Sequence, residues 1–494
     1  MSGIETPTGT AILHVQGALT GADVKSYIRH EADLPTGQAA LAVRFAFSPA
    51  VVSGQKNMLT LSIFDPTGFR GAGHRHGNIH EVVIGPESAT PGYLPGELPA
   101  GRWTIEIDTH MVMPGEECRY TLDVEARPAA SEARAGGGDP SDTNGTGGAS
   151  RGTSARRGQS ASAGARLSSG AVDPAPARGA AASYGEGWFR GDLHSHTFHS
   201  DASWGVADLV ARARGLGLDF LALTDHNTTS GLEDAHAAAS DGLLIIDGLE
   251  LTTYWGHALC LGTNRWVDWR TGPGALEMPA IARERIAAGE TFIIAHPSSI
   301  GDPYCTGCRW VYDDMRPGPA RLFEVWNGPW SGDSNNEEAL AFWYDLLTQG
   351  VRIYATAGSD THNSAGYAGN VGFNVVRAGR CDQASILSAI RSGAEFLSNG
   401  PALFFEGVAA NGARVQAAAE LPGKDARIEV RFDNATAGSR LRLVGDGRIV
   451  HEAPVSRAGT QSIRPDDYRA RWYVAELRGP DGEMSAVTNP IFVA

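Results

Sequence analysis

The segment from residue 128 to residue 184 constrains the fold of this chain more than any other feature. It consists mainly of Gly, Ala, Ser, Arg, Pro and Thr, with almost no aromatic or large aliphatic side chains. Such a segment cannot bury enough apolar surface to offset the entropy that its backbone loses on ordering. We therefore predict a disordered linker at 128–184, so that the 494 residues fold as two or three separate domains.

The residues before this linker and those at the end of the chain have the patterns of β-strands. Residues 1–127 contain apolar or alternating runs at 41–47, 58–64, 103–107 and 120–124, between turn-rich breaks. In residues 401–494 the runs 441–444 and 448–450 flank the turn Gly445-Asp446-Gly447. These patterns predict an N-terminal β-sandwich at 1–127 and a small C-terminal β-domain at 401–494.

Residues 185–400 have a different pattern, in which short apolar runs alternate with helical periodicity. Strand candidates lie at 220–223, 243–246, 257–261, 292–295, 322–326 and 352–355. Helix candidates lie at 206–213, 281–288, 337–347 and 386–390. Repeated βα units predict an α/β domain built as a barrel of parallel strands, with a doubly wound open sheet as the alternative.

Potential metal ligands follow the ends of the predicted strands in this α/β domain. His194 and His196 are one residue apart, so their side chains point the same way from an extended backbone. His257 differs, because it opens its apolar run. In barrel enzymes, side chains at the C-terminal ends of the strands converge on the active-site face. The other candidates are His226, Glu250, His296, Asp360 and His362.

This set of imidazoles and carboxylates suits zinc, iron or manganese, and several carboxylates could bridge neighbouring ions. A cluster of two or three divalent ions can lower the pKa of a bound water and hold a substrate oxygen as a Lewis acid. Cys305 and Cys308 are a weaker signal, because no second pair of this spacing accompanies them. We interpret that pair as a loop feature rather than as a redox or metal site.

Six separated motifs occur in the order that is typical of the PHP superfamily, which is named after polymerase and histidinol phosphatase members. The resemblance covers residues 185–400, and within the superfamily the sequence is most similar to the CehA/McbA group of metallohydrolases. The N-terminal β-domain resembles an extra domain that some of that group carry. The resemblance implies a distorted (βα)7 barrel. The motifs are 192–197 with 200–201, 224–227, 250–252, 256–257, 295–297 and 359–362.

Carried over residue by residue, the family pattern implies three metal ions and a bridging carboxylate. The implied reaction is attack by a metal-bound, bridging hydroxide on a phosphorus or carbonyl centre, with Asp360 as the catalytic candidate for proton transfer to the leaving group. The implied ligands are His194, His196, Glu250 and Asp360 for the first ion, Glu250, His257 and His296 for the second, and Asp201, His226 and His362 for the third.

Composition and charge limit the partners and the location. The net charge of −15 opposes nucleic-acid binding, and no apolar run approaches the length of a membrane span. The N-terminus lacks the pattern of a secretory signal, and five scattered cysteines fit a reducing compartment. We therefore expect a cytoplasmic protein with a small-molecule partner, and a homodimer through the N-terminal β-domain is left open.

Several further polar or aromatic residues receive no catalytic role. His74 and His76, among glycines, are interpreted as part of a polar surface loop, with a loop that reaches the active site of another domain as the alternative. His199 is interpreted as a structural residue, with a place in the pocket as the alternative. Arg309 fits either a phosphate-binding residue or a solvated cation. Large aromatics near strand ends fit packing and a substrate pocket equally: Tyr254, Trp255, Trp310, Trp326 and Trp330.

Two functions of different classes are compatible with these observations. The first is a metal-dependent hydrolase of a small-molecule ester, which is either a phosphoester or a carboxyl or carbamate ester. The alternative is a metal-binding recognition or regulatory module without turnover, because roughly half of the chain lies outside the α/β domain and fold alone does not determine function.

Overall fold

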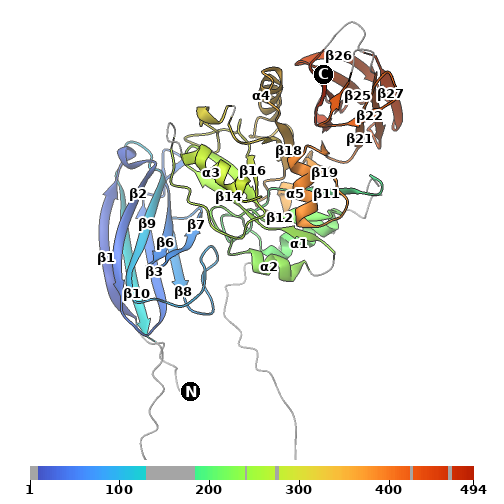
Figure 1. Ribbon diagram of the computed structural model, residues 1–494. Coiled ribbons are helices and arrows are strands. Elements are labelled where there is room, and N and C mark those ends of the chain that lie inside the picture. Colours follow the sequence, from blue (N-terminus) through green and yellow to red (C-terminus); the bar gives the residue numbers. More distant parts are fainter. Residues whose placement is uncertain are drawn as a thin grey trace, which may run out of the picture.

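The computed structural model describes residues 9–128, 184–239, 242–272, 277–316, 318–422, 427–464 and 470–493. It contains an N-terminal sandwich, a central domain that begins after residue 183, and a C-terminal β-domain (Figure 1). The linker predicted at 128–184 lies almost entirely outside the described residues. Its disorder therefore stays a prediction.

The N-terminal domain consists of two four-stranded antiparallel sheets, as the alternating sequence pattern predicted. The strand orders are β1-β10-β3-β8 and β2-β9-β6-β7, and a separate hairpin joins β4 to β5. The strands are β1 (Thr10–Leu19), β2 (Ser26–Leu34), β3 (Gln38–Ser48), β4 (Val51–Val52), β5 (Gln55–Lys56), β6 (Met58–Asp65), β7 (Gly68–Gly73), β8 (Ile79–Ile84), β9 (Gly101–Met111) and β10 (Cys118–Pro128).

The sheet that contains β6 and β9 packs against the central domain with its outer face. Along β6, Leu61 and Ile63 point into the sandwich core, whereas Thr60 and Ser62 point outward and are nevertheless buried. Polar outward residues are normally solvated, so a second layer must cover them. Tyr254 of the central domain supplies part of that layer, because it stacks on Tyr27 at 4.9 Å and donates a hydrogen bond to the Ser26 carbonyl.

The central domain is a strand-rich α/β structure whose strands fall into two sheets. One sheet contains β13-β12-β11-β19-β20, and the other has the order β14-β15-β16-β17-β18. The strands are β11 (Trp188–Asp192), β12 (Phe220–Ala222), β13 (Leu244–Ile246), β14 (Gly248–Thr253), β15 (Gly256–Leu261), β16 (Thr291–Ile294), β17 (Leu322–Asn327), β18 (Tyr354–Gly358), β19 (Phe373–Arg377) and β20 (Glu395–Ser398). The α-helices are α1 (Val206–Gly215), α2 (Leu232–Ala238), α3 (Glu277–Ala287), α4 (Asn336–Thr348) and α5 (Gln383–Arg391).

The expected (βα)7 barrel of parallel strands is not confirmed by this topology. Strand β15 pairs antiparallel with both β14 and β16, and β19 pairs antiparallel with both β11 and β20. Only Tyr254 and Trp255 lie between β14 and β15, which is too short a connection for a parallel crossover. Strand β14, which contains Glu250, was not predicted. The sequence pattern placed Glu250 after the end of a strand, whereas the structure places it within one.

The two sheets of the central domain meet where the predicted ligands lie. Parallel bridges join Ser195 to Thr361 and His226 to Glu250, just beyond the ends of β11, β18 and β12. The Asp360 amide also donates to the His194 carbonyl at 2.9 Å. Strand ends that are distant in sequence are therefore fixed next to one another by backbone hydrogen bonds.

The C-terminal β-domain continues one sheet of the central domain, because β20 pairs with β29. A further four-stranded sheet, β22-β21-β24-β27, covers it. No helix among the described residues is long and apolar enough to cross a membrane. The strands are β21 (Ala402–Val408), β22 (Arg414–Gln416), β23 (Glu420–Leu421), β24 (Arg427–Asp433), β25 (Arg440–Gly445), β26 (Arg448–Pro454), β27 (Gly459–Ile463), β28 (Trp472–Arg478), β29 (Met484–Thr488) and β30 (Ile491–Val493).

Candidate metal centre

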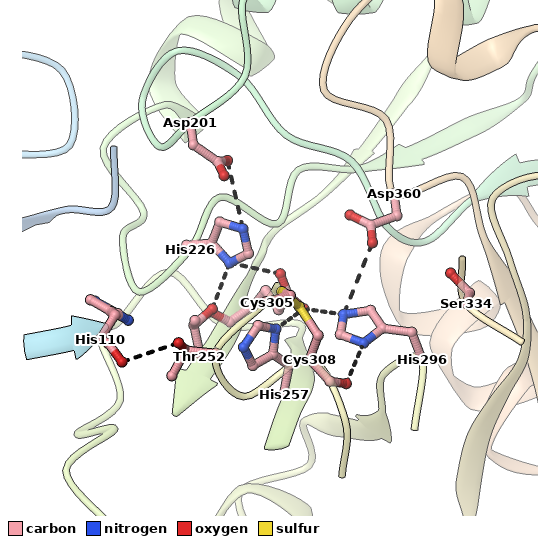
Figure 2. The surroundings of a disulfide bond; sticks show 12 residues. His110, Asp201, His226, Thr252, His257, His296, Cys305, Cys308, Ser334 and Asp360 are labelled. Atoms are coloured by element: carbon pink, nitrogen blue, oxygen red, sulfur yellow. Dashed lines mark hydrogen bonds and ion pairs between the residues drawn. A yellow bond between two sulfur atoms is a disulfide. The ribbon is translucent and has the colours of Figure 1, made fainter. Parts of the chain in front are cut away.

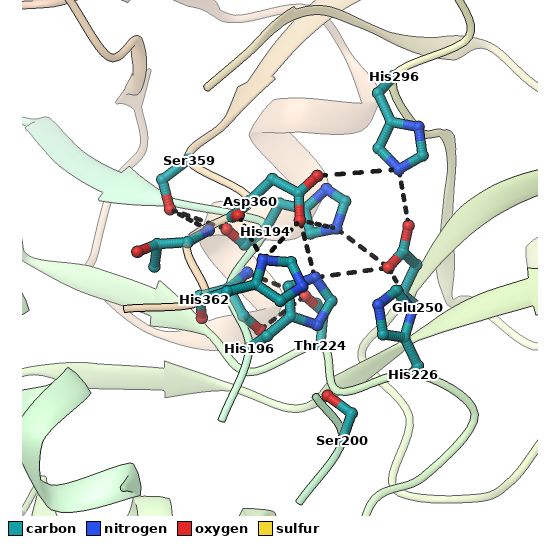
Figure 3. Close-up of polar contacts among 12 residues, drawn as sticks. His194, His196, Ser200, Thr224, His226, Glu250, His296, Ser359, Asp360 and His362 are labelled. Carbon is teal, nitrogen blue, oxygen red and sulfur yellow. Dashed lines mark hydrogen bonds and ion pairs between the residues drawn. The ribbon is translucent and has the colours of Figure 1, made fainter. Parts of the chain in front are cut away.

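All nine residues predicted as metal ligands lie together at the junction of the two sheets. Figure 3 shows seven of them: His194, His196, His226, Glu250, His296, Asp360 and His362. Their side-chain nitrogen and oxygen atoms form four overlapping groups, and within each group the atoms lie within 4.8 Å of one another. The groups are His194, His296 and Asp360; His194, His196 and Glu250; His226, Glu250 and His257; and His196, Asp201, His226 and His362.

The Glu250 carboxylate is the centre of this arrangement. Its Oε2 lies 2.8 Å from His226 Nδ1, 3.3 Å from His194 Nε2 and 3.5 Å from His196 Nε2. Its Oε1 lies 2.9 Å from His296 Nε2 and 3.1 Å from His257 Nδ1. A carboxylate that contacts five imidazoles through both oxygens has the position of a ligand shared between ions.

Two further carboxylates, those of Asp360 and Asp201, also contact histidines of the cluster. Asp360 Oδ1 lies 3.0 Å from His196 Nε2 and 3.5 Å from His194 Nε2. Asp201 Oδ1 lies 3.1 Å from His362 Nε2 and 3.6 Å from His226 Nε2. These groupings overlap the predicted ligand sets without reproducing them. His196 joins the set predicted for the third ion, His296 groups with His194 and Asp360, and His226 groups with Glu250 and His257. The assignment of residues to particular ions stays a prediction.

Several buried atoms of the cluster have no hydrogen-bond partner among the described residues. They include Nε2 of His194, His196 and His257, and Oε2 of Glu250. Buried polar atoms without partners cost free energy in a folded protein. Because imidazole nitrogens and carboxylate oxygens are ligands for divalent cations, the residues present fit bound metal ions.

The electrostatics of the cluster favour deprotonated carboxylates. Burial acts to raise the pKa of the Glu250 carboxyl, but His194, His226 and His257 outweigh it and hold this pKa well below its usual range. Burial also acts to raise the pKa of the Asp360 carboxyl, but His194 and His196 outweigh it and hold this pKa well below its usual range. Both side chains are therefore charged and able to coordinate a cation.

The histidines divide into two kinds. Burial next to His362 and His226 lowers the pKa of His196 to about 3, so this imidazole is neutral without metal. Burial also acts to lower the pKa of His296, but Glu250 raises it to about 9. Burial likewise acts to lower the pKa of His362, but the Asp201 carboxylate raises it to about 10. In the metal-free protein, protons therefore occupy part of the centre at neutral pH.

Metal binding should consequently release protons and weaken as the pH falls. A cation binds only the neutral imidazole, so at pH 7 it must displace the protons on His296 and His362, whose pKa values of about 9 and 10 lie above that pH. It must also displace the proton on His194, because burial acts to lower the pKa of this residue but Asp360 and Glu250 raise it well above its usual value. Calorimetric titration of Mn²⁺ at pH 7, in two buffers with different ionisation enthalpies, should show about three or more protons released per filled centre. The His362→Gln variant should release about one fewer, and binding without proton release would contradict this account.

Glu324 is a buried acid at the centre that was missed in the sequence. It accepts hydrogen bonds from His194 Nδ1 at 3.1 Å, the His296 amide at 2.8 Å and Asn327 Nδ2 at 2.9 Å. A carboxylate on the outer nitrogen of a metal-binding imidazole fixes the orientation of the ring. The signal in the sequence was a single acid within the buried strand β17, Leu322–Asn327.

Because Gly358 has no side chain, Glu324 and His194 can contact each other beside it. A Cβ atom at this position would clash with Glu324 Oε1 and His194 Cβ. Gly358→Ala should therefore lower the free energy of unfolding by about 1–3 kcal/mol, the usual effect of overpacking. Thermal unfolding measures this change. Gly379→Ala is the matched control, because an added Cβ meets no atom there within 4 Å, and equal stabilities of the two variants would contradict the packing described.

Backbone conformation adds to the evidence for a functional site. Asn227, His296 and Asp360 have φ angles of 52°, 23° and 50°, in the region that L-residues rarely adopt. Such strained residues concentrate at functional sites, where the surrounding structure holds them. Asn227, which was expected to orient a ligand, bonds the Thr252 backbone through both amide atoms, and Thr252 Oγ1 lies 2.6 Å from His226 Nδ1.

The loop of His74 and His76 reaches the metal centre, so its interpretation as a polar surface loop is wrong. His74 is buried and packs its ring on His226 at 4.4 Å, and His76 Nε2 lies 3.2 Å from Asp201 Oδ2. His110, taken as an ordinary histidine, packs against His74. Strand β7 leads into the loop but escaped recognition because it is rich in glycine. Gly73 is needed there, since a Cβ would lie 2.6 Å from the Tyr93 hydroxyl.

Cys305 and Cys308 form a disulfide in a loop beside the centre (Figure 2). The sequence predicted a loop feature at this pair but not the bond. His296 Nδ1 lies 3.1 Å from the Cys308 carbonyl, and Gly307 lies so close to His257 that a Cβ would be 3.0 Å from its Nε2. The loop thus packs against two of the candidate ligands.

The remaining candidates have structural contacts. His199 is buried and lies 2.8 Å from Ser230 Oγ, outside the four ligand groups. Asp225 accepts hydrogen bonds from Thr197 and Ser200 and so holds the loop after β11. Arg309 pairs with Glu338 at 2.5 Å. Four of the aromatic side chains for which packing and a pocket were equal alternatives pack in one hydrophobic core: Trp255, Trp310, Trp326 and Trp330. Tyr254 is also buried, but it stacks on Tyr27 of the sandwich.

The fold and the site together define an α/β domain with a histidine and carboxylate centre for divalent cations. Residues 192–266 match the family model described as the PHP domain. The matched segment includes six of the nine candidate ligands: His194, His196, Asp201, His226, Glu250 and His257.

Curated relatives share short regions with this chain. It is 42% identical over 65 residues to a 5'-3' exoribonuclease of Haemophilus influenzae, which is 13% of this chain and 24% of that protein. It is 39% identical over 78 residues to a 3',5'-nucleoside bisphosphate phosphatase of Chromobacterium violaceum, which is 15% of this chain and 27% of that protein. The chain thus spans about a quarter of the length of these relatives, which are hydrolases of phosphoesters.

Solved structures show lower similarity. A two-domain protein from Bacteroides vulgatus, which contains a predicted PHP-like metal-dependent phosphoesterase, is 16% identical with a TM-score of 0.38, over 62% of this chain and 95% of that chain. An amidohydrolase from Chromobacterium violaceum with bound sulfate and no metal is 18% identical with a TM-score of 0.25, over 35% and 87%. These TM-scores are too low to support a structural argument.

Proposed function

We propose that this protein is a metal-dependent phosphoesterase that acts on a small-molecule ester. The observation that carries the proposal is the Glu250 carboxylate, which contacts five imidazoles and has the position of a bridge between ions. Divalent ions bound there would activate water and polarise the ester oxygen. The matched PHP domain and the phosphoesterase relatives support this chemistry.

Asp360 is the proposed group for proton transfer: its carboxylate would accept the proton of the attacking water and pass it to the leaving oxygen. Its Oδ2 accepts a hydrogen bond from Asn327 Nδ2 at 3.3 Å, while its Oδ1 faces His196 and His194. Its side chain also borders the open pocket, so one carboxylate contacts both the cluster and the space where substrate would bind. A positioned carboxylate of this kind can contribute general acid or base catalysis.

A comparison of ester classes tests the proposal. Phenyl phosphate, phenyl acetate and phenyl N-methylcarbamate share one leaving group, so phenol release by the metal-loaded protein compares the bonds directly. We expect hydrolysis of the phosphate, lost after chelation and in His194→Ala. Turnover of only the acetate or carbamate would assign the site to carbon esters instead. Bound metal without turnover of any class would overturn the proposal and favour a recognition module.

A further inference from the structure

A pocket of about 750 Å³ lies between the N-terminal sandwich and the central domain. The central domain contributes candidate metal ligands to its lining: Asp201, His226, His257, His296, Asp360 and His362. The sandwich contributes the β4–β5 hairpin and the loop after β7. Small-molecule sites have volumes of about 300–1,000 Å³, so this pocket has the size for one small ligand.

The sandwich is a fixed wall of this pocket because several contacts tie it to the central domain. The Thr228 hydroxyl donates to the Gly92 carbonyl at 2.9 Å, and the Thr306 hydroxyl donates to the His110 carbonyl at 3.1 Å. Phe69 stacks on Trp266 at 4.8 Å and belongs to the core of the central domain. Figure 2 shows His110 on its sandwich strand beside the candidate ligands.

The wall contributes directly to the metal centre through His76. Asp201 turns Oδ1 toward His226 and His362, and its Oδ2 lies 3.2 Å from His76 Nε2. His76 is thus a positioning residue for a candidate metal ligand, supplied by a different domain. The active centre is therefore incomplete without the sandwich.

The wall also contains one cationic side chain that has no partner among the described residues. Lys56, on β5, lines the pocket and has no hydrogen bond or ion pair with any residue that the structure describes. Arg75, by contrast, donates to the Pro91 carbonyl, and His76 is paired with Asp201. An unpaired ammonium opposite a metal centre is suited to an anionic oxygen of the substrate.

Apolar side chains surround this cation. Phe47, Met58 and Met111 of the sandwich line the pocket. Val51 and Tyr304 line it from the two domains and are 52% and 72% exposed. They would be covered by the organic group of a bound ligand.

We propose that the N-terminal sandwich is the substrate-recognition wall of the metal centre, in which Lys56 binds the phosphate of a small organic phosphate ester and the apolar side chains contact its organic group. This inference rests on the proposed function. It restricts the substrate to molecules that fit a pocket of about 750 Å³ rather than to nucleic-acid strands.

Lys56→Gln in the metal-loaded full-length protein tests the cation. Loss of one charge-assisted hydrogen bond should raise KM for phenyl phosphate about 10-fold or more, with kcat and metal content unchanged. Calorimetry should show phenylphosphonate, which is not hydrolysed, binding more weakly by the same factor. Arg44→Gln is the matched control, because it removes one charge from an exposed position in β3 of the same domain.

Ligand comparisons test the apolar part and the size limit. Phenylphosphonate should bind about 10-fold or more tightly than methylphosphonate, because its ring buries apolar surface.

Unchanged KM and unchanged phosphonate affinity in Lys56→Gln would overturn the inference, whereas hydrolysis by the wild-type protein would leave the proposed function standing. Equal kcat/KM for phenyl phosphate and a 5'-phosphorylated oligoribonucleotide would overturn the size limit. Absence of wild-type hydrolysis would reject the proposed function, and phosphonate binding would still decide the role of Lys56.

Discussion

Asp360→Asn should lower kcat for phenyl phosphate by about 10²- to 10⁴-fold, the usual contribution of a positioned acid or base. The change removes the charge that faces His194 and His196 but retains the shape of the side chain. Asn also tolerates the positive φ of 50° at this position, so the backbone need not relax. Initial rates and thermal unfolding together measure the effect.

The control for this substitution is Asp345→Asn on α4. The Asp345 side chain is exposed and forms no hydrogen bond or ion pair with the residues that the structure describes. It should keep the wild-type kcat. If Asp360→Asn also kept kcat within about twofold, far below the expected general-acid effect, Asp360 would have no catalytic role.

Glu250→Gln should remove at least one equivalent of bound metal and abolish most of the turnover. The second predicted ion would retain only His257 and His296, and the five surrounding imidazoles would lose their shared carboxylate. Even substitutions of residues that only orient metal ligands typically cost 10- to 100-fold in metal affinity or activity, so we expect a loss of at least about 100-fold here. Elemental analysis after dialysis measures the metal content.

The matched substitution is Glu338→Gln, which removes one carboxylate from the same domain. Glu338 is about half exposed and, among the residues that the structure describes, forms an ion pair only with Arg309. This variant should retain the full metal content and the wild-type rate. An unchanged metal content in Glu250→Gln would contradict the bridging role of that side chain.

Much of the strand and helix structure could be predicted because burial imposes a period on the sequence. The alternating runs of the sandwich became β3, β6, β9 and β10, and the apolar runs of the central domain became β12, β13, β15, β16, β17 and β18. Pairing direction could not be predicted in the same way. The short connection between β14 and β15 makes that pair antiparallel, but an apolar run alone does not show where one strand ends and the next begins.

Most of the candidate ligands could be predicted because they follow strand ends in one domain, where a common edge brings them together. Glu250 and His257 differ, since they lie within β14 and β15. Glu324 was missed because it acts through His194 rather than at the edge itself. For His74 and His76, the sequence offered contact with the active site of another domain only as the alternative to a surface loop, and Lys56 was missed, because packing between domains leaves no local pattern. The polar outer face of β6 and β9 looked solvated, and only the structure shows that the central domain covers it.

The central claim is that the histidine and carboxylate cluster is a hydrolytic metal centre. The most direct test is the initial rate of phenyl phosphate hydrolysis as Mn²⁺ or Zn²⁺ is titrated into protein that has been freed of metal. The rate should rise from background and saturate when about two or three equivalents, the number expected from the sequence, have bound. A rate that is independent of metal, or absent at full loading, would contradict the claim.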